Sequence, residues 1–316
     1  MPPSPIITII GSLNIDLVSN VQRIPAAGET LSANSFNVGC GGKGANQAVA
    51  CAKLSRSRAA VENGSAIVKM VGAVGDDAYG ELMLSELRGY GVELSDVRVE
   101  KGSKTGVAVI IVEETTGENR IIISAEANDS LRPEHFQELP VPLPQLLILQ
   151  LEIPLQTVLH ILKIARKQGV EVLLNPAPAV SLPEETYALV THLVVNESEA
   201  ATLSGCSASD LDEVEGLRKV ADKFRNLGVT NVIITLGGNG VFYSGPGEVS
   251  GLEPALKVAV VDTTAAGDTF VGAFSLEAVK EGFDLRVAIQ KATRAAAKTV
   301  GRKGAQSSIP WLDELS

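Results

Sequence analysis

The segment Val261-Asp262-Thr263-Thr264-Ala265-Ala266-Gly267-Asp268-Thr269-Phe270 joins an apolar, strand-like run, Leu256–Val261, to a helical pattern over Ala273–Val279. Its three small residues, 265–267, therefore fall where the helix is expected to begin. The first N–H groups of a helix have no partner inside the helix, and the helix dipole adds partial positive charge there. Because small side chains leave this backbone open, the segment predicts an anion site of the kind that binds phosphate.

Asp268 stands inside this predicted anion site. A carboxylate beside a bound phosphate is electrostatically unfavourable, so its presence there indicates a task. The task that fits is removal of a proton from a hydroxyl that attacks phosphorus. A structural interpretation stands beside this one, because Asp is a common helix N-cap. On this segment alone the two interpretations are about equally supported.

A second glycine cluster, Gly39-Cys40-Gly41-Gly42-Lys43-Gly44-Ala45-Asn46-Gln47, opens another helical pattern, Ala45–Leu54. Glycines before a helix give a backbone that a ligand can approach closely. The cluster is not a Walker A loop, because Gly44 follows Lys43 where that motif needs Ser or Thr. No G-x-G-x-x-G follows the first expected strand either, which argues against a Rossmann dehydrogenase.

Polar side chains also follow the first expected strand. Asn14 and Asp16 alternate with apolar residues, so both face one side of an extended segment. Together with Lys43 and Asn46 they would suit a polyhydroxyl ligand. Taken singly, Asn14 and Asp16 can also be turn formers, and Lys43 can be a solvated charge.

Composition limits the classes of function. The 316 residues are 45% hydrophobic, enough for a large core in a single α/β domain over residues 1–316. A net charge of −10 argues against nucleic acid or an anionic membrane as the main partner, but not against nucleotides. The three scattered cysteines fit a reducing compartment. The proline-rich start lacks signal-peptide features, and no apolar run reaches the roughly 20 residues of a membrane span, so we expect a cytosolic or nuclear location.

Short apolar runs alternate with longer helical patterns along most of the chain, which predicts a doubly wound, mostly parallel sheet flanked by helices. The expected strands are Ile6–Ile10, Ala66–Val71, Leu146–Gln150, Glu171–Asn175, His192–Val195 and Asn231–Thr235. The expected helices are Ala45–Leu54, Tyr79–Tyr90, Pro154–Gln168, Asp210–Leu227, Gly272–Glu281 and Asp284–Val300.

Three segments interrupt this alternation. Residues 17–38 carry no helix signal, and residues 97–124 read as extended strands joined by a Gly-containing turn. The segment Ser55–Ser65 is polar and unpatterned, so we expect a mobile loop insertion there.

The two glycine-rich segments resemble the N-terminal and C-terminal signatures of the PfkB family of carbohydrate kinases, and within that family the chain is most similar to the ribokinases. The resemblance runs from Ile6 to Trp311. It implies a ribokinase-like α/β fold in which segments of about 17–38 and 97–124 form a small β-sheet lid. It also implies transfer of phosphate from ATP to the 5-hydroxyl of D-ribose. Further matching segments are Val71–Asp77, Gln150–Glu152, Asn175–Pro178, Asn196–Ala200 and Thr235–Gly240.

The resemblance also implies roles for individual residues. Asp268 would be the base, and the backbone of Ala265, Ala266 and Gly267 would hold the transferring phosphoryl group. The residues implied for the sugar are Asn14, Asp16, Gly42, Lys43, Asn46, Glu152 and Asp268. Those implied for the nucleotide are Asn196, Glu199, Thr235, Gly237, Gly240 and Gly267. Without the resemblance, Asn196 and Glu199 read as a helix cap, and Asn239-Gly240 as a hairpin turn.

Cations and a second subunit are implied in the same way. Mg²⁺ would travel largely with ATP and be approached by Glu199 through water. Members of the family often dimerise through the lid, so a homodimer is expected. The segment Ala125-Glu126-Ala127-Asn128 departs from the Gly-Ala-Asn run of many relatives, which leaves the detail of the lid open. A potassium site would be formed by Asp262, Thr264, Thr299, Arg302, Gly304 and Ser308.

Alternative functions remain at this point. The chain could be a related kinase acting on 2-deoxyribose, fructose or adenosine. A pocket that uses Asn14 and Asp16 for vicinal hydroxyls is expected to discriminate against 2-deoxyribose, because a buried polar group without its partner is unfavourable. A non-catalytic sugar sensor is disfavoured, since Asp268, Gly267 and Glu199 are all present.

Overall fold

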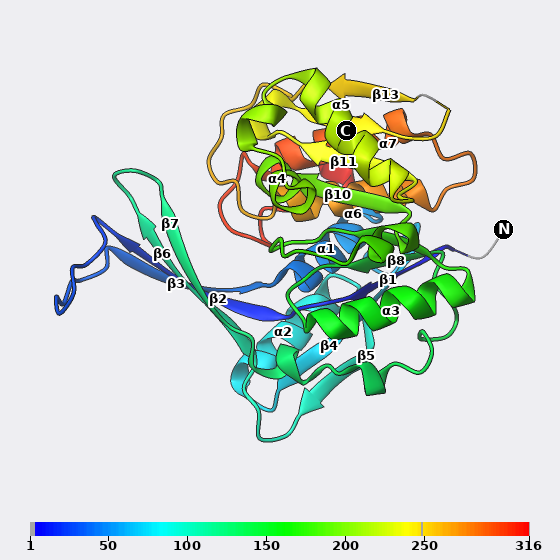
Figure 1. Cartoon of the computed structure of the whole chain (residues 1–316). Helices are drawn as coiled ribbons and strands as arrows, with labels where there is room; N and C mark the ends of the chain where they lie inside the picture. Colours follow the sequence, from blue (N-terminus) through cyan, green and yellow to red (C-terminus); the bar gives the residue numbers. More distant parts are fainter. Residues whose placement is uncertain (1–3, 248, 316) are drawn as a thin grey trace.

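The computed structural model describes residues 4–247 and 249–315. Figure 1 shows a body built around a large sheet and a smaller sheet that projects from one side of it. The order of strands in the large sheet is β13-β12-β11-β10-β9-β8-β1-β4-β5. These strands are β1 (Ile6–Ile10), β4 (Ile67–Gly75), β5 (Glu93–Glu100), β8 (Leu146–Leu149), β9 (Glu171–Leu174), β10 (His192–Asn196), β11 (Asn231–Thr235), β12 (Val241–Ser244) and β13 (Ser250–Glu253). Of the expected N-terminal tail, Met1–Pro3 lie outside the described residues.

Helices cover both faces of the large sheet. One face packs against α1 (Lys43–Leu54), α2 (Ala78–Gly89), α6 (Ala266–Ala278) and α7 (Leu285–Thr299). The other packs against α3 (Leu155–Gln168), α4 (Glu197–Ser204) and α5 (Val214–Asn226). Every residue of β1 and β8 is buried, because these strands have apolar neighbours on both sides. The doubly wound α/β fold predicted from the sequence is confirmed.

The direction of winding reverses in the middle of the sheet. From β1 the chain reaches its neighbour β4 and then β5, whereas β8 lies on the other side of β1 and continues outward to β9, β10 and β11. All these pairs are parallel. In open α/β sheets, ligands bind where strand order reverses, at the carboxyl ends of the strands. The edge above β1 and β8 is therefore the expected position of a site.

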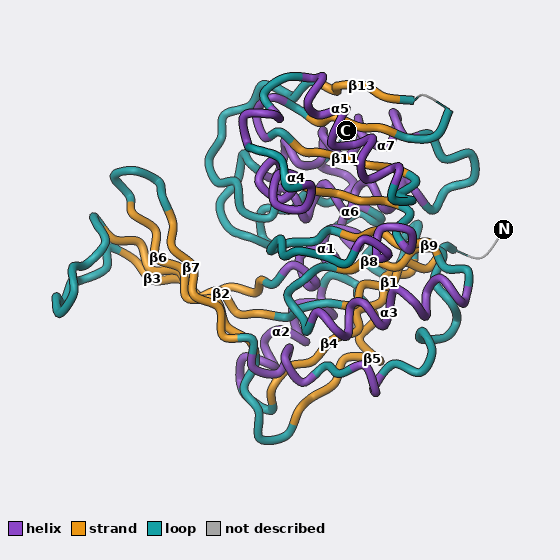
Figure 2. Tube along the Cα trace, in the orientation of Figure 1, coloured by secondary structure: helices purple, strands orange, loops and turns teal. Residues whose placement is uncertain are grey.

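The smaller sheet, which we call the lid, contains β2 (Asn14–Val21), β3 (Ser35–Gly41), β6 (Gly106–Glu113) and β7 (Asn119–Ser124) in the order β3-β2-β6-β7. Figure 2 shows these strands extending away from the body. β2 begins only a few residues after β1, so the base of the lid lies next to the carboxyl end of β1. Residues 97–100 of the expected lid segment belong instead to β5, which pairs with β4 in the large sheet.

Several expected elements differ from the structure. The apolar run Leu256–Val261 is not a strand: it is irregular and exposed, and the Val261 N–H bonds to the carbonyl of Val300 at the end of α7. Helix α6 begins at Ala266, among the small residues where a helix start was expected, although the helical pattern itself was placed only over Gly272–Glu281. The expected helix over 210–227 divides into a 3₁₀ turn, Ala208–Leu211, and α5. β12 and β13 were not among the expected strands, although the hairpin interpretation of Asn239-Gly240 agrees with the return of β12 beside β11.

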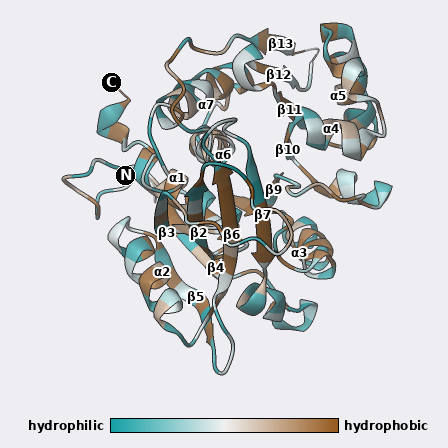
Figure 3. Ribbon diagram, turned by 90° about the vertical axis from the view of Figure 1, so that its left-hand side faces the viewer, coloured by the Kyte–Doolittle hydropathy of each residue, from teal (hydrophilic) through white to brown (hydrophobic). Residues whose placement is uncertain are grey.

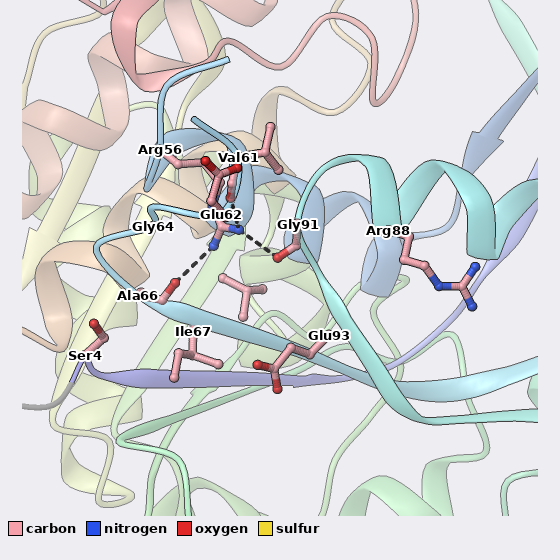
Figure 4. Close-up of a pocket in the computed structure, with 11 residues that line it drawn as sticks. Ser4, Arg56, Val61, Glu62, Gly64, Ala66, Ile67, Arg88, Gly91 and Glu93 are labelled. Carbon is pink, nitrogen blue, oxygen red and sulfur yellow. Dashed lines mark hydrogen bonds between the residues drawn. The ribbon is translucent and has the colours of Figure 1, made fainter. Parts of the chain in front are cut away.

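The segment Ser55–Ser65 is anchored, contrary to the expectation of a mobile loop. Arg56 is only 5% exposed and donates hydrogen bonds to the carbonyls of Val61 at 3.0 Å, Gly91 at 2.7 Å and Ala66 at 3.0 Å. Figure 4 shows Arg56 at the edge of a cavity of about 450 Å³ that none of the predicted site residues lines. Gly91 has a φ of 79°, and a Cβ there would overlap Arg56. One buried guanidinium therefore holds this loop in place.

Candidate active site

The amino-terminal ends of α1 and α6 meet at the carboxyl edge of the large sheet. Asp268, on the first turn of α6, is 7% exposed. Its Oδ2 accepts a hydrogen bond from Asn46 Nδ2 at 3.0 Å, and its Oδ1 accepts one from Gln47 Nε2 at 2.9 Å. Both donors lie near the amino-terminal end of α1. Asp268 is thus a buried carboxylate held by two neutral amides rather than an N-cap, because the N-cap of α6 is Ala265.

The backbone around Ala265 forms a tight turn into α6. Ala265 has a φ of 59°, in the left-handed region that a non-glycine residue seldom adopts. The carbonyl of Ala265 accepts both the N–H and the hydroxyl of Thr269, each at 2.8 Å. The N–H of Ala266 bonds to Thr263 within the turn. Apart from adjacent residues and the backbone of α6, no atom of the described residues lies within 4 Å of the position that a Cβ of Gly267 would occupy, so this first helical turn opens onto free space.

The glycines of residues 41–44 allow α1 to begin against the chain that follows β1. A Cβ on Gly41 would overlap the carboxylate of Asp16, and one on Gly42 would lie 2.7 Å from the backbone N of Asn14. Gly42 also has a φ of 85°. Larger residues would therefore separate the start of α1 from Asn14 and Asp16, which lie on β2 at the base of the lid.

Glu152 lies on the other side of the start of α1 from Asn14 and Asp16. It follows β8, and its Oε2 accepts hydrogen bonds from Ser12 Oγ at 2.5 Å and from the backbone N of Lys43 at 2.9 Å. Asn14 is oriented by Asn128, whose Nδ2 donates to Asn14 Oδ1 at 2.8 Å. The structure thus brings together Asn14, Asp16, Gly42, Lys43, Asn46, Glu152 and Asp268, the set predicted for the sugar.

Carboxylates are crowded at this site. Burial, followed by the charges of Glu152 and Asp268, raises the pKa of Asp16 from 3.8 to about 7. Burial lowers the pKa of Lys43, but Asp268, Glu152 and Glu199 raise it, and the net direction is upward. Lys43 is therefore the ammonium that these carboxylates share. Because Asp16 binds its proton more tightly in the folded chain, its contribution to the free energy of unfolding is lost as pH rises from about 4 to about 7.

A cavity of about 400 Å³ adjoins the carboxylates on the side of α4. It is lined by Lys43, Ala177, Pro178, Ala179, Ser198, Glu199 and Thr202. Asn196 caps α4: its Oδ1 accepts the N–H of Glu199 and the hydroxyl of Ser198, each at 2.8 Å, while Glu199 Oε2 accepts the N–H of Asn196 at 2.9 Å. The capping interpretation of this pair is therefore correct. Burial raises the pKa of Glu199, against the effect of Lys43.

The glycines after β11 form the turn predicted from Asn239-Gly240. Thr235 ends β11, a 3₁₀ turn covers Gly237–Asn239, and β12 returns antiparallel to β11. Gly240 has a φ of 102°, and a Cβ there would overlap the carbonyl of Glu253. Gly237 has a φ of 52° and faces open space. Thr235, Gly237 and Gly240 thus lie at the same carboxyl edge as Asn196, further along the sheet.

The residues predicted for potassium come from two loops that are joined through Asp262. Its Oδ1 accepts the N–H and the hydroxyl of Thr264 at 2.9 and 2.6 Å, and its Oδ2 accepts the N–H of Gly304 at 2.9 Å. Against partial burial, these bonds lower the pKa of Asp262. Thr299 Oγ1 lies 2.9 Å from Thr269 Oγ1, which links the second loop to α6.

The remaining members of that set serve visible structural roles. Ser308 donates from its hydroxyl to the carbonyl of Ala305 at 2.7 Å, and Arg302 pairs with Glu314 at 3.0 Å. The buried amide of Gln306 has no hydrogen-bond partner for its oxygen or its nitrogen within the described part of the chain.

Comparison with known proteins identifies the family. Residues 6–312 match the description "pfkB family carbohydrate kinase". The chain belongs to the PfkB family of carbohydrate kinases. It is 45% identical to "Ribokinase" of Schizosaccharomyces pombe over 98% of this chain and 96% of that protein. It is 37% identical to "Deoxyribokinase" of Salmonella typhimurium over 98% and 97% of the two chains.

Solved structures of PfkB-family proteins have the same fold. Ribokinase from Thermotoga maritima superimposes with a TM-score of 0.84 at 38% identity, covering 98% of each chain. Arabidopsis thaliana ribokinase complexed with ribose and ATP superimposes with a TM-score of 0.85 at 32% identity, covering 99% of this chain and 98% of the other. These matches confirm the ribokinase-like fold with its separate small sheet.

Three residues at the site were not predicted. Gln47, Asn128 and Ser12 each bind a predicted side chain: Asp268, Asn14 and Glu152, respectively. Gln47 and Asn128 lie inside segments that the sequence analysis singled out, and that position is the signal that could have indicated them. Across the described ranges, no group of three or more His, Cys, Asp or Glu side chains is arranged to hold a metal ion, and no helix there is long and apolar enough to cross a membrane.

The raised pKa of Asp16 predicts that sugar affinity depends on pH. Hydroxyl groups donate to the ionised carboxylate, so the Kd for D-ribose should rise as pH falls through about 7, approaching tenfold per pH unit below that value. Calorimetric titration with ribose between about pH 5.5 and pH 8.5 measures this. Asp16→Asn should bind weakly with no such pH dependence, and a flat wild-type profile would contradict the assignment.

Proposed function

We propose that this PfkB-family chain transfers the γ-phosphoryl group of ATP to the 5-hydroxyl of D-ribose, giving D-ribose 5-phosphate and ADP. The observation that supports this most directly is the position of Asp268. It is a buried carboxylate on the first turn of α6, beside the open space at Gly267 and opposite Asn14, Asp16 and Glu152.

The chemistry follows from these positions. Asn14, Asp16 and Glu152 offer hydrogen-bond groups for the sugar hydroxyls. Asp268 takes the proton of the 5-hydroxyl while the hydroxyl oxygen forms a bond to the γ-phosphorus. The bond between the γ-phosphorus and the oxygen that bridges it to the β-phosphate breaks, which releases ADP. The first turn of α6 and the ammonium of Lys43 offset the charge on the transferring group.

Asn196 and Glu199 suit the nucleotide end. The cap occupies Asn196 Oδ1, so its Nδ2 can donate to a phosphate oxygen. Thr235, Gly237 and Gly240 lie further along the same carboxyl edge of the sheet, where they would contact the phosphates and ribose of ATP. Mg²⁺ bound to ATP would neutralise phosphate charge and be approached by Glu199, which lines the cavity beside Lys43.

Ribose is favoured over the alternative acceptors. Asp16 is a buried carboxylate whose ionised form needs hydroxyl donors, and 2-deoxyribose lacks one of the two vicinal hydroxyls that Asn14 and Asp16 would bind. A kinase for 2-deoxyribose stays the second candidate, since one relative at 37% identity carries that name. A location in the cytosol or nucleus stays a prediction from the sequence.

Replacing Asp268 tests the proposed base. Asp268→Asn keeps the size of the side chain, but its amide nitrogen cannot accept a hydrogen bond and the side chain cannot take up the proton. We therefore expect kcat for ribose-dependent ADP release to fall by roughly a hundred- to ten-thousandfold. Ribose Kd, measured by calorimetry, should change by less than about tenfold. The matched control is Asp222→Asn at an exposed position of α5, which should keep wild-type activity. A retained kcat in Asp268→Asn would overturn the proposed mechanism.

We also propose that the loops joined by Asp262 hold potassium. Asp262 supplies negative charge, and Thr264, Thr299, Arg302, Gly304 and Ser308 supply nearby backbone or hydroxyl oxygens. The link from Thr299 to Thr269 connects this site to the turn that begins α6. A bound cation would therefore order the anion site without touching the substrate.

Potassium should raise both kcat and the Tm of the free protein, because a ligand that binds only the folded state stabilises it. Activity assays and thermal melts in KCl against choline chloride measure both effects. Asp262→Asn should remove most of the response while leaving activity without potassium near that of wild type under the same conditions. If wild type and Asp262→Asn respond equally to potassium, the proposed potassium site is wrong.

We further propose that the lid forms a homodimer. Strand pairing places Val38, Leu17, Val109 and Ile122 in one row across the sheet, on the face opposite the one that carries Asp16. Ile122 is 64% exposed, and Phe36 on the same face is 60% exposed. Figure 3 shows hydrophobic colouring along the lid strands. An exposed apolar row of this kind is typical of a protein interface.

Ile122→Lys should convert a dimer into a monomer, because it places a charge in the apolar row. Light scattering coupled to size exclusion measures the mass. Val141→Lys introduces the same charge at an exposed residue outside the lid and should leave the dimer intact. A monomeric wild-type protein, or a dimer that tolerates Ile122→Lys, would refute the lid interface.

A further inference from the structure

Gln47 is a fully buried amide whose nitrogen and oxygen are both hydrogen-bonded at the site. Its Nε2 donates to Asp268 Oδ1 at 2.9 Å and to Asn175 Oδ1 at 3.0 Å. Its Oε1 accepts a hydrogen bond from Gln150 Nε2 at 2.7 Å. Gln47 lies near the amino-terminal end of α1, which runs beside α6 in Figure 1. This side chain therefore ties Asp268 on α6 to the ends of β8 and β9.

The neighbours of Gln47 fix the orientation of its amide. Asn175 donates from Nδ2 to the carbonyl of Val194 at 2.9 Å, so its oxygen is the atom left to face Gln47. Asp268 also presents an oxygen, whereas Gln150 presents a nitrogen. A reversed amide would set oxygen against oxygen on two sides and nitrogen against nitrogen on the third. The Nε2 group must therefore point at Asp268.

We infer that Gln47 is a positioning residue for the phosphoryl-transfer reaction. Together with Asn46, it holds the Asp268 carboxylate in one rotamer and stabilises its ionised form, which is the form that can accept a proton. This inference rests on the proposed role of Asp268 as the base. Each carboxylate oxygen accepts one amide N–H, so each keeps acceptor capacity for a substrate hydroxyl.

The charges around Asp268 make neutral donors necessary. Asp16 and Glu199 face it as carboxylates, and Lys43 is the cation that interacts with it. A cationic donor at position 47 would bind the carboxylate too tightly for proton transfer, and an acidic residue would compete for its proton. A neutral amide of fixed orientation supports the charge without competing for the proton.

The test compares Gln47→Leu and Gln47→Glu with wild type, measuring kcat against pH at saturating ribose and MgATP. Saturating sugar separates this profile from the titration of Asp16 in the free protein. Gln47→Leu should lower kcat by roughly ten- to a hundredfold, the effect of one hydrogen bond to a charged group. Gln47→Glu should lower kcat at neutral pH and recover toward alkaline pH, because two adjacent carboxylates share a proton.

Gln137→Glu makes the same chemical change at an exposed residue and should have the wild-type profile. Thermal melts and ribose Kd values monitor folding, since Gln47→Leu removes the hydrogen bonds that Gln47 makes to Asn175 Oδ1 and Gln150 Nε2. If Gln47→Glu folds, binds ribose and keeps the wild-type pH profile, the inference is wrong. If Asp268→Asn is inactive while both Gln47 variants match wild type, only the positioning role fails. If Asp268→Asn is active, the base assignment itself fails.

Discussion

The close packing of α1 against α6 is the constraint on which the site depends. Gly272 on α6 has no side chain, and a Cβ there would overlap that of Ala50 on α1. At this separation Asn46 and Gln47 reach Asp268 directly. Two segments more than two hundred residues apart in sequence thereby form one catalytic edge. The glycines at 41, 42 and 44 also allow close packing at the amino end of α1. A Cβ at these positions would overlap Asp16, Asn14 and Ser12, respectively.

The second constraint is electrostatic. Glu152, Glu199 and Asp268 gather around one ammonium, that of Lys43, and Asp16 lies near Glu152 and Asp268. Burial and mutual repulsion are reflected in the raised pKa values of Asp16 and Glu199. Such crowding is unfavourable for stability and typical of a functional site. In the proposed reaction, sugar hydroxyls would satisfy the carboxylates on one side, and the magnesium carried by ATP would offset charge on the other.

Some of this could be predicted from the sequence, for physical reasons. β1 and β11 are continuous apolar runs, and their strands are fully or almost fully buried with the bounds expected. Leu256–Val261 is equally apolar but pairs with no strand, because its backbone turns toward Val300 at the end of α7. An apolar run in the sequence forms a buried strand only where the fold supplies a neighbouring strand for it to pair with. The start of α6 was predicted from the small residues Ala265, Ala266 and Gly267, whereas the apolar pattern alone placed this helix only from Gly272.

The site shows the same division. Asp268 and Lys43 stand out because they are charged residues within glycine-rich segments, whereas Glu152 was expected only from the family resemblance. Gln47, Asn128 and Ser12 are neutral, and their partners lie more than a hundred residues away. No local spacing indicates such contacts, and only the fold reveals them. Arg56 is a similar case, since a polar segment gave no indication that its guanidinium would be buried.

The most direct test of the account is the position of the phosphate in the product. Asp268 is proposed to act on the 5-hydroxyl while Asn14 and Asp16 bind the vicinal hydroxyls. Purified protein would be incubated with D-ribose and MgATP, and the product examined by proton-coupled ³¹P NMR. The account predicts a triplet, from phosphate on the C5 methylene. A doublet, from phosphate on a carbon that bears one hydrogen, would mean that the sugar binds in another orientation and would contradict it.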